Sequence, residues 1–200
     1  MNLDTAIRRR RMVREYADAP VPRALVEELL DLGVRAPSAG FSQGVSLQTL
    51  DGAAVDRFWE LTVDAGSRWL ERMRTARVLI LVWASKAAYL DRYAEPDKGW
   101  TDRDETRWTA PYWYVDAGMA AENILLGVVD RGLGACFFGI PPGKVDAVRA
   151  GFGVPAEQLS VGVISLGWPR PGETRSGSPR RRQRVPREQQ VHWGQWGEPG

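Results

Sequence analysis

The sequence predicts a domain in which helices cover a β-sheet. Apolar runs of strand length alternate along the chain with amphipathic stretches of helix length. Its 200 residues are 44% hydrophobic and 26% charged, an ordinary balance for one globular domain with a sizeable core. No uninterrupted apolar run reaches about 18 residues, so we expect no transmembrane helix. The fold class is therefore α/β or α+β.

The N-terminal part predicts two helices and a loop. Residues 5–11 form a short helix that Asn2 or Asp4 can cap. A second helix starts at Pro22, since proline is favourable in a first turn. Residues 33–44, rich in glycine and serine, then interrupt regular structure.

The remaining strands and shorter helices follow from apolar runs and their periodicity. Residues 78–83 (VLILVW) are apolar throughout, as expected for a strand covered on both faces. The other predicted strands are residues 45–50, 135–138 and 161–166. The shorter predicted helices are residues 56–62, 69–73 and 144–150.

The longest predicted helix covers residues 112–131 and ends at Gly132, in the position of a C-cap glycine. Apolar and small residues occupy nearly every side of it, and such a helix must be buried all round. Because a monomer of this size has little room for that, we expect part of the helix to lie in a subunit interface. The alternative is a core helix packed only within its own chain.

Scarce cysteine and histidine limit the chemistry. The single Cys136 excludes an internal disulfide, fits a reducing cytoplasm and leaves no cysteine-based zinc or iron–sulfur site. We expect Cys136 to be inert packing, and the single His192 to be a surface or packing residue. No apolar signal segment follows Met1, so we expect a cytoplasmic protein without a membrane partner. Any catalysis is expected to use a cofactor and no metal.

Two arginine-rich stretches suggest an anion site. Arg10, Arg11 and Arg14 lie within five residues, where their charges repel unless an anion binds. Near the C-terminus, Arg182 and Arg184 face the same way in an extended segment and can hold one phosphate together. The alternatives are a solvated basic surface and a solvated tail.

Two further motifs suit a ligand that lies close to the backbone. Residues 36–43 (APSAGFSQ) combine small residues with hydrogen-bonding serine and glutamine, although an ordinary loop has the same composition. Residues 132–140 (GLGACFFGI) resemble a dinucleotide fingerprint only superficially, because their glycines end a helix and open a strand. We therefore expect no Rossmann NAD site.

In this order, the four motifs resemble the nitroreductase family of FMN-dependent flavoproteins over nearly the whole chain. The turn at residues 166–169 (LGWP) and residues 191–193 (VHW) add to the resemblance. The resemblance implies an α+β fold with a central, mostly antiparallel sheet flanked by helices. It also implies an intertwined homodimer that binds FMN at its interface, with the long central helix as the dimer helix.

The resemblance assigns the cofactor contacts residue by residue. The N-terminal arginines and the C-terminal pair match the basic residues near the FMN phosphate and ring, and the backbone of residues 138–140 matches the stretch near flavin N5. Met12 replaces the usual serine, Phe41 the usual asparagine, and residues 44–45 a common Pro-Trp. The expected cofactor-binding residues are Arg10, Arg11, Met12, Arg14, Pro37, Ser38, Ala39, Phe41, Gln43, Arg72, Phe138, Gly139, Ile140, Arg182 and Arg184.

The implied activity is that of an FMN-dependent oxidoreductase. Hydride passes from NADH or NADPH through flavin N5 to a planar small-molecule acceptor, such as a nitroaromatic compound or a quinone, in a ping-pong sequence without a side-chain acid. Residues 85–113 are expected to form an aromatic lid, and residues 169–200 an extended arm that helps to bind the phosphate. The aromatic residues expected to contact the acceptor are Tyr93, Trp100, Trp108 and Trp113.

Three other functions use the same features. Another flavin reaction on this fold, such as flavin fragmentation, dehalogenation, dehydrogenation or deazaflavin chemistry, fits the departures at Met12 and Phe41. A flavin carrier without turnover would use the same motifs. A nucleic-acid-binding module could use the arginines on phosphates and tryptophans on bases, but the net charge is only +2, so we expect no nucleic-acid partner.

Overall fold

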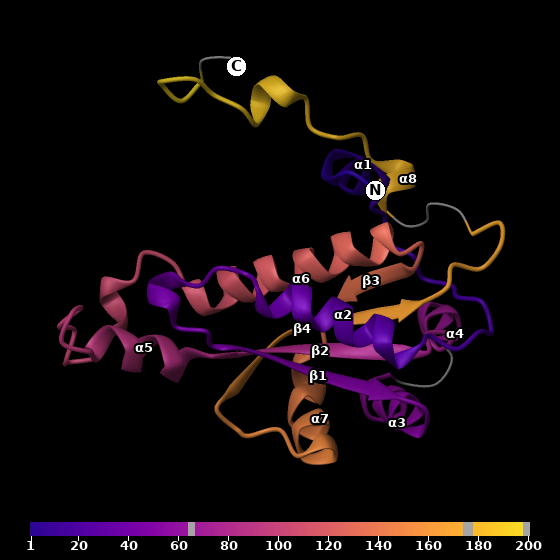
Figure 1. The fold of residues 1–200 in the computed structure, drawn as a ribbon, viewed down its shortest axis with the longest axis horizontal. Helices are drawn as coiled ribbons and strands as arrows, with labels where there is room; N and C mark the ends of the chain where they lie inside the picture. The colour runs from indigo at the N-terminus through magenta and orange to yellow at the C-terminus, as the bar shows by residue number, and fades with distance from the viewer. Residues whose placement is uncertain (64–66, 174–177, 198–200) are drawn as a thin grey trace.

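The computed structural model describes residues 1–63, 67–173 and 178–197. Its sheet contains strands β1 (Val45–Asp51), β2 (Val78–Ser85), β3 (Gly134–Phe138) and β4 (Gln158–Gly167) in the order β1-β2-β4-β3. Every neighbouring pair of these strands is antiparallel. With helices on both faces (Figure 1), the predicted antiparallel sheet flanked by helices is confirmed.

Helices cover the two faces of the sheet unequally. The long helix α6 and helix α2 lie on one face, and α3 and α7 on the other, while α4 and α5 lie at opposite ends (Figure 1). Short 3-10 turns occupy residues 39–41, 105–107, 142–144 and 187–189. The helices are α1 (Leu3–Arg9), α2 (Arg23–Val34), α3 (Ala53–Thr62), α4 (Arg68–Met73), α5 (Lys86–Ala94), α6 (Tyr112–Asp130), α7 (Val145–Phe152) and α8 (Ser178–Arg181).

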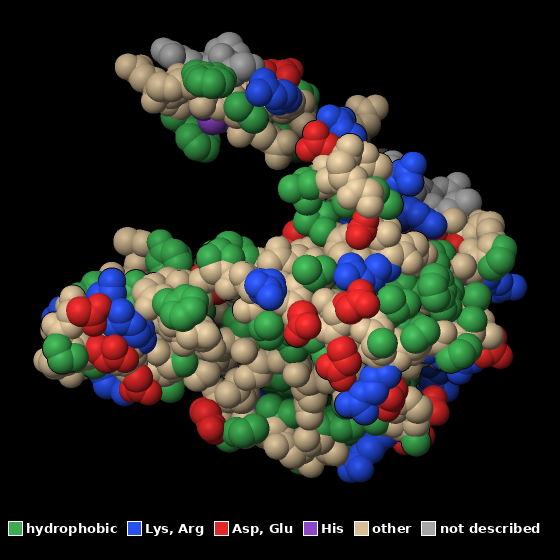
Figure 2. Space-filling model, viewed as in Figure 1, with side chains coloured by type: hydrophobic (Ala, Val, Ile, Leu, Met, Phe, Trp, Pro, Cys, Tyr) green, Lys and Arg blue, Asp and Glu red, His purple; other side chains and the backbone are tan. Residues whose placement is uncertain are grey.

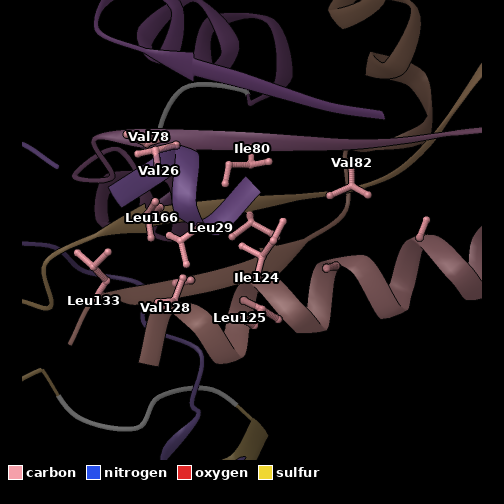
Figure 3. Close-up of a cluster of buried hydrophobic side chains, with 14 of the residues drawn as sticks. Val26, Leu29, Val78, Ile80, Val82, Ile124, Leu125, Val128, Leu133 and Leu166 are labelled. Carbon is pink, nitrogen blue, oxygen red and sulfur yellow. The ribbon is translucent and has the colours of Figure 1, made fainter. Parts of the chain in front are cut away.

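Strand β2 lies between two hydrophobic cores, one on each face of the sheet. Alternate residues of a strand point to opposite faces, and Ile80 packs toward α2 and α6 while Leu81 packs toward α3 and α7. Figure 3 shows the first core, where Leu29 of α2 and Ile124 of α6 meet the strand. The apolar run at residues 78–83 is therefore buried on both faces, as the sequence predicts.

The first helix is displaced relative to the sequence prediction. Asn2 caps it by accepting a hydrogen bond from the Thr5 N–H at 2.9 Å, and α1 ends at Arg9. The prediction that the helix continues to residue 11 is wrong. The chain instead becomes extended, and Met12 forms a parallel bridge with Ala135 at the free edge of β3. Arg10 and Arg11 therefore lie after the helix.

Helix α6 is not covered on all sides within one chain. Gly132, with φ of 70°, follows its end as the predicted C-cap glycine. The side facing α2 and the sheet is buried, but Val115 is 45% exposed and Met119 36% exposed on the opposite side. Tyr114 is also exposed there. The helix therefore presents an apolar surface to its surroundings, which we call the α6 face (Tyr114, Val115 and Met119).

The segment expected to be a lid contributes to the core. The aromatic and charged composition of residues 85–113 is a poor core pattern, yet Tyr89 and Trp113 are buried in the core with α6. Their rings lie 6.2 Å apart in an edge-on contact. Residues 86–94 of the segment form helix α5, which packs on the 39–41 turn. The segment is therefore partly structural.

The C-terminal segment leaves the body of the molecule. After β4, the chain passes α1 at α8, and residues 187–197 then project away with open space between them and the body (Figures 1 and 2). Residues 174–177 and 198–200 of the predicted arm lie outside the described residues. None of the described helices has the length and apolar character needed to span a membrane.

Candidate functional site

The two arginine-rich stretches, remote in sequence, line one cleft. Its volume is about 720 Å³, and it lies between the end of α1 and the segment that contains α8. The lining residues are Ile7, Arg8, Arg10, Arg11, Met12, Arg14, Ser178, Arg182, Gln183 and Arg184. The structure thus brings together the arginines that the sequence analysis selected from both ends of the chain.

Strand pairing positions the N-terminal arginines. The Val13 N–H donates to the Ala135 carbonyl at 2.8 Å, which fixes this segment on the edge of β3. The Met12 sulfur accepts a hydrogen bond from the Phe137 N–H at 3.4 Å, so the residue that replaces the family's serine packs against the strand. Because side chains alternate along an extended segment, the flanking Arg11 and Val13 point away from Met12.

The positive charge in the cleft is only partly neutralised. Arg11 forms an ion pair with Glu173, whose side chain is 0% exposed, and Arg10 Nε lies 3.0 Å from a carboxylate oxygen of Glu122 on α6. Within the described part of the chain, neither Arg182 nor Arg184 has an acidic partner. Guanidinium groups present planar donors that match phosphate or carboxylate oxygens. The cleft can therefore bind an anion.

The third motif lies next to this cleft but lines a different cavity. Residues 138–140 follow the strand that Met12 joins, and they border a cavity of about 460 Å³ between α3, α4 and β3. Cys136 lies two residues before Phe138 on β3. It is buried, and burial raises the pKa of its thiol. This agrees with its expected role as inert packing.

Arg72 does not line the arginine cleft. It lies on α4, and its Nε is 3.5 Å from a carboxylate oxygen of Glu15, which also pairs with Arg170. The Glu15 segment follows the arginine motif directly. Arg72 is thus connected to the arginine motif by its ion pair with Glu15.

We call α1, residues 10–14, α8 and residues 182–184 together the arginine end.

The second motif, residues 36–43, lies at the other end of α6 and is held by hydrogen bonds. The Ala39 N–H donates to Asp116 on α6 at 2.8 Å, and Arg92 on α5 donates to the Gly40 carbonyl at 2.8 Å. The Gln43 N–H donates to the Ser38 hydroxyl at 3.0 Å. Pro37 belongs to the same loop. These contacts give the loop one defined shape.

Two residues of this loop have strained backbones. Phe41 and Gln43 have φ of 58° and 51°, in the left-handed region that side chains with a Cβ rarely adopt. Phe41 is 73% exposed, so packing of its side chain contributes little to offset this strain. Such strain occurs at ligand-binding sites, where the loop shape is set for a partner.

The four aromatic residues expected at the acceptor site pack on one another. Tyr93 and Trp108 have ring centroids 4.4 Å apart, and Trp100 lies within 5.4 Å of Trp108. Trp113 is 6.2 Å from Trp108. The cluster also touches the loop, since a Cβ on Gly40 would lie 2.7 Å from the Tyr93 ring. We call residues 36–43, α5 and this aromatic cluster the loop end.

Asp116 is a residue that the sequence analysis missed. It is 2% exposed, and the same carboxylate oxygen accepts hydrogen bonds from Ala39 and, at 2.7 Å, from the Tyr89 hydroxyl. Burial, followed by this hydrogen bond, raises the pKa of Tyr89. An acidic residue among the apolar and small residues in the first half of the helix is the signal that could have found it.

The candidate residues therefore form two groups. Arg10, Arg14 and the C-terminal arginines meet at one end of α6, whereas the 36–43 loop and the aromatic cluster meet at the other end, beside α5 (Figure 1). One chain does not bring the two groups together. Among the described residues, no group of three metal-ligating side chains is present.

Comparison with known proteins links this geometry to one family. The sequence profile of the Nitroreductase family matches residues 7–168. An NADH dehydrogenase of Thermus thermophilus is 27% identical over 207 aligned positions, covering 96% of each chain.

Solved structures share the fold. The nitroreductase CinD of Lactococcus lactis, in complex with nicotinic acid, has a TM-score of 0.72 at 18% identity, covering 92% of this chain and 100% of that chain. A Desulfovibrio desulfuricans protein in complex with FMN has a TM-score of 0.67 at 22% identity, covering 93% of this chain and 98% of that chain.

Proposed function

This chain belongs to the nitroreductase family of oxidoreductases, and from that premise we propose that it binds FMN in a composite site of a homodimer. When bound, FMN supplies two-electron chemistry between NADH or NADPH and a planar acceptor such as a nitroaromatic compound or a quinone. The observation that carries the proposal is the cleft lined by both arginine stretches.

The residues of the cleft fit a mononucleotide phosphate. Arg182 and Arg184 are exposed in the cleft, and no acidic partner offsets their charge within the described residues. Arg10 and Arg14 line the opposite wall. Arg11 is held by the buried Glu173, so its role is to anchor the start of the C-terminal segment as well as to add positive charge. A charge-assisted hydrogen bond to phosphate is stronger than a neutral one.

The rest of the cofactor site requires a second copy of the chain. The 36–43 loop has a shape set for a partner, yet it lies at the far end of α6 from the arginines. Two copies related by a twofold axis across the α6 face would bring the loop end of each to the arginine end of the other. The exposed Val115 and Met119 and the projecting residues 187–197 supply surfaces for this association.

The chain's own side chains position and shield the reactants. The cleft arginines hold the phosphate, and positive charge also stabilises an electron-rich ring. Residues 138–140 follow the strand that Met12 joins, and Arg72 pairs with Glu15, so both would meet the ring, while Ser38 and Gln43 would come from the partner copy. The aromatic cluster, with Tyr93 and Trp108, would cover a planar acceptor.

The test is FMN retention by an arginine-deficient variant. The purified protein should be yellow, and its flavin absorbance should bleach when NADH or NADPH is added without oxygen. Replacing both C-terminal arginines (R182A/R184A) should weaken FMN binding by at least about a hundredfold, since each charged contact contributes about 1.5–3 kcal/mol. Equilibrium dialysis of FMN measures this change.

A matched variant controls for loss of charge alone. Arg23→Ala with Arg77→Ala also removes two positive charges, at exposed ion pairs with Glu27 and Asp18 outside the cleft. This variant should bind FMN as the parent does. A colourless parent protein, or equal FMN affinity in the two double variants, would remove the basis of the proposal.

A further inference from the structure

A buried carboxylate and a buried tyrosine lie against the 36–43 loop. Asp116 of α6 is 2% exposed, and Tyr89 of α5 is 0% exposed. Neither residue lines the arginine cleft or the cavity between α3, α4 and β3. Because a carboxylate is costly to bury unless its oxygens are hydrogen-bonded, the partners of Asp116 indicate what this side chain does.

One oxygen of Asp116 holds the start of the loop. Its Oδ2 accepts a hydrogen bond from the Ala39 N–H at 2.8 Å. The Tyr89 hydroxyl donates to the same oxygen at 2.7 Å. Ser38 directly precedes the Ala39 amide. The position of Ser38 relative to α6 is therefore set by this one acceptor.

The ring of Tyr89 packs against the residue that ends the loop. A Cβ on Gly44 would lie 2.6 Å from a ring carbon of Tyr89 and 2.9 Å from the Ser85 carbonyl oxygen. Glycine at this position thus leaves the space that the tyrosine ring needs to bring its hydroxyl to Asp116. The same tyrosine therefore contacts the end of the loop directly and, through Asp116, its start.

The residues between these two fixed points hold a shape that an isolated loop would not keep. Phe41 and Gln43 have φ of 58° and 51°. Strained backbones of this kind persist only where the surrounding structure holds them. The Ser38 hydroxyl oxygen accepts a hydrogen bond from the Gln43 N–H at 3.0 Å, which leaves the hydroxyl proton to donate to another group.

We infer, on the premise of the FMN site proposed above, that Asp116 and Tyr89 are positioning residues for the cofactor. They hold the 36–43 loop in the strained shape in which Ser38 and Gln43 bind FMN, and neither of them touches FMN itself. When the Asp116 acceptor is lost, the Ala39 amide is released and the loop relaxes. The arginine cleft, at the other end of α6, keeps its structure.

The first measurement requires no cofactor. It follows hydrogen exchange of the Gln43 N–H, which Asp116 does not contact, by ¹H–¹⁵N spectra of the full-length protein as purified. Asp116→Ala should accelerate this exchange at least about tenfold, because the loop opens locally. Equal exchange rates in Asp116→Ala and in the control variant below would overturn the inference, whether or not the protein binds FMN.

The control is Leu81→Ala. Leu81 is 1% exposed and packs on the opposite face of the sheet, toward α3 and α7. Removing a buried leucine side chain lowers stability substantially, but this change leaves the contacts of the loop intact. Leu81→Ala should therefore keep the Gln43 exchange rate and the FMN affinity of the parent.

The second measurement is the dissociation constant of FMN, by equilibrium dialysis. Asp116→Ala should weaken binding about tenfold and Y89F about fivefold, whereas D116N, which keeps an acceptor oxygen, should stay within about twofold of the parent. Gly44→Ala displaces the ring that carries the Tyr89 hydroxyl, so it should match Y89F. The two changes together should weaken binding no more than either alone.

A double-mutant cycle separates positioning from a general structural role. If Asp116 acts through Ser38 and Gln43, Asp116→Ala should weaken FMN binding by less than about twofold when both of these residues are already alanine. A tenfold loss in that background, or full additivity of Gly44→Ala and Y89F, would overturn the inference. A parent protein that binds no FMN would remove the proposed function instead, and the exchange measurement would still decide whether Asp116 holds the loop.

Discussion

The two ends of helix α6 are built on opposite principles. At the arginine end, like charges gather around an open cleft, and Arg182 and Arg184 have no acidic partner within the described residues. At the loop end, Asp116 accepts hydrogen bonds from Tyr89 and from the Ala39 N–H, and Arg92 donates to the Gly40 carbonyl, in what we call the closed network. The first end gathers positive charge around open space, whereas the second is held in one shape by its own hydrogen bonds. In the proposed homodimer, the arginine end of one copy would meet the loop end of the other.

The largest expected effect comes from separating the two copies. Val115→Glu with Met119→Glu places two charges on the α6 face, where both side chains are exposed in the single chain, so each chain should still fold. Light scattering should report a fall from twice 22.3 kDa to 22.3 kDa. FMN affinity should fall at least about tenfold, because the loop end and the arginine end no longer meet.

The control for this change is Val34→Glu, at an exposed valine on α2. It should leave both the mass and the FMN affinity as in the parent. If the double glutamate variant stays dimeric, the α6 face is not the interface. If it becomes monomeric and still holds FMN tightly, the two ends act within one chain.

The next effect concerns the closed network at the loop end. Asp116→Ala leaves the Tyr89 hydroxyl and the Ala39 N–H buried without their acceptor, and each such loss costs about 1–3 kcal/mol. Urea unfolding should therefore show a loss of about 2–5 kcal/mol. Asp116→Asn keeps an acceptor oxygen and should lose about 1 kcal/mol. If the alanine variant loses less than about 1 kcal/mol of unfolding free energy, the network does not stabilise the loop.

A smaller effect compares one tyrosine at each end. Burial raises the pKa of Tyr16, near the arginine motif, and of Tyr89 at the loop end. The unfolded chain loses these protons near pH 10, whereas the folded chain retains them. The contribution of these two hydroxyls to the unfolding free energy is therefore fully present below pH 10 and is lost as the pH rises above it.

The variants Y89F and Y16F measure each share of this alkaline loss. Each should make the decline in unfolding free energy above pH 10 less steep than in the parent. An unchanged slope in both buried variants would show that these hydroxyls ionise normally in the folded protein.

The sequence was most informative where local patterns decide the structure. The apolar run at residues 78–83, the glycine after α6 and the Asn2 cap all depend on neighbouring residues, and all are confirmed. The predicted extent of the first helix was wrong because Met12 and Val13 pair with the edge of β3, a contact between distant parts of the chain. Local propensity cannot reveal such a contact.

Sites were less predictable than strands for the same reason. The two arginine stretches could be selected from their residue types, and they do line one cleft. The pairing of Arg11 with Glu173, and of Asp116 with Tyr89, joins residues far apart in sequence. The aromatic residues of 85–113 did not reveal that Tyr89 and Trp113 belong to the core. The cavity between α3, α4 and β3 had a sequence signal only at residues 138–140, because its other walls come from distant parts of the chain.

The most direct test of the composite site mixes two defective proteins. One carries R182A/R184A at the arginine end, and the other carries Ser38→Ala with Gln43→Ala at the loop end; each alone should retain little FMN. If each site takes one end from each copy, half of the randomly reassembled dimers contain both variants, and each of these has one intact site. After unfolding and refolding together, the mixture should recover about a quarter of the parent's tightly bound FMN. Recovery no greater than the sum of the two separate variants would contradict the account.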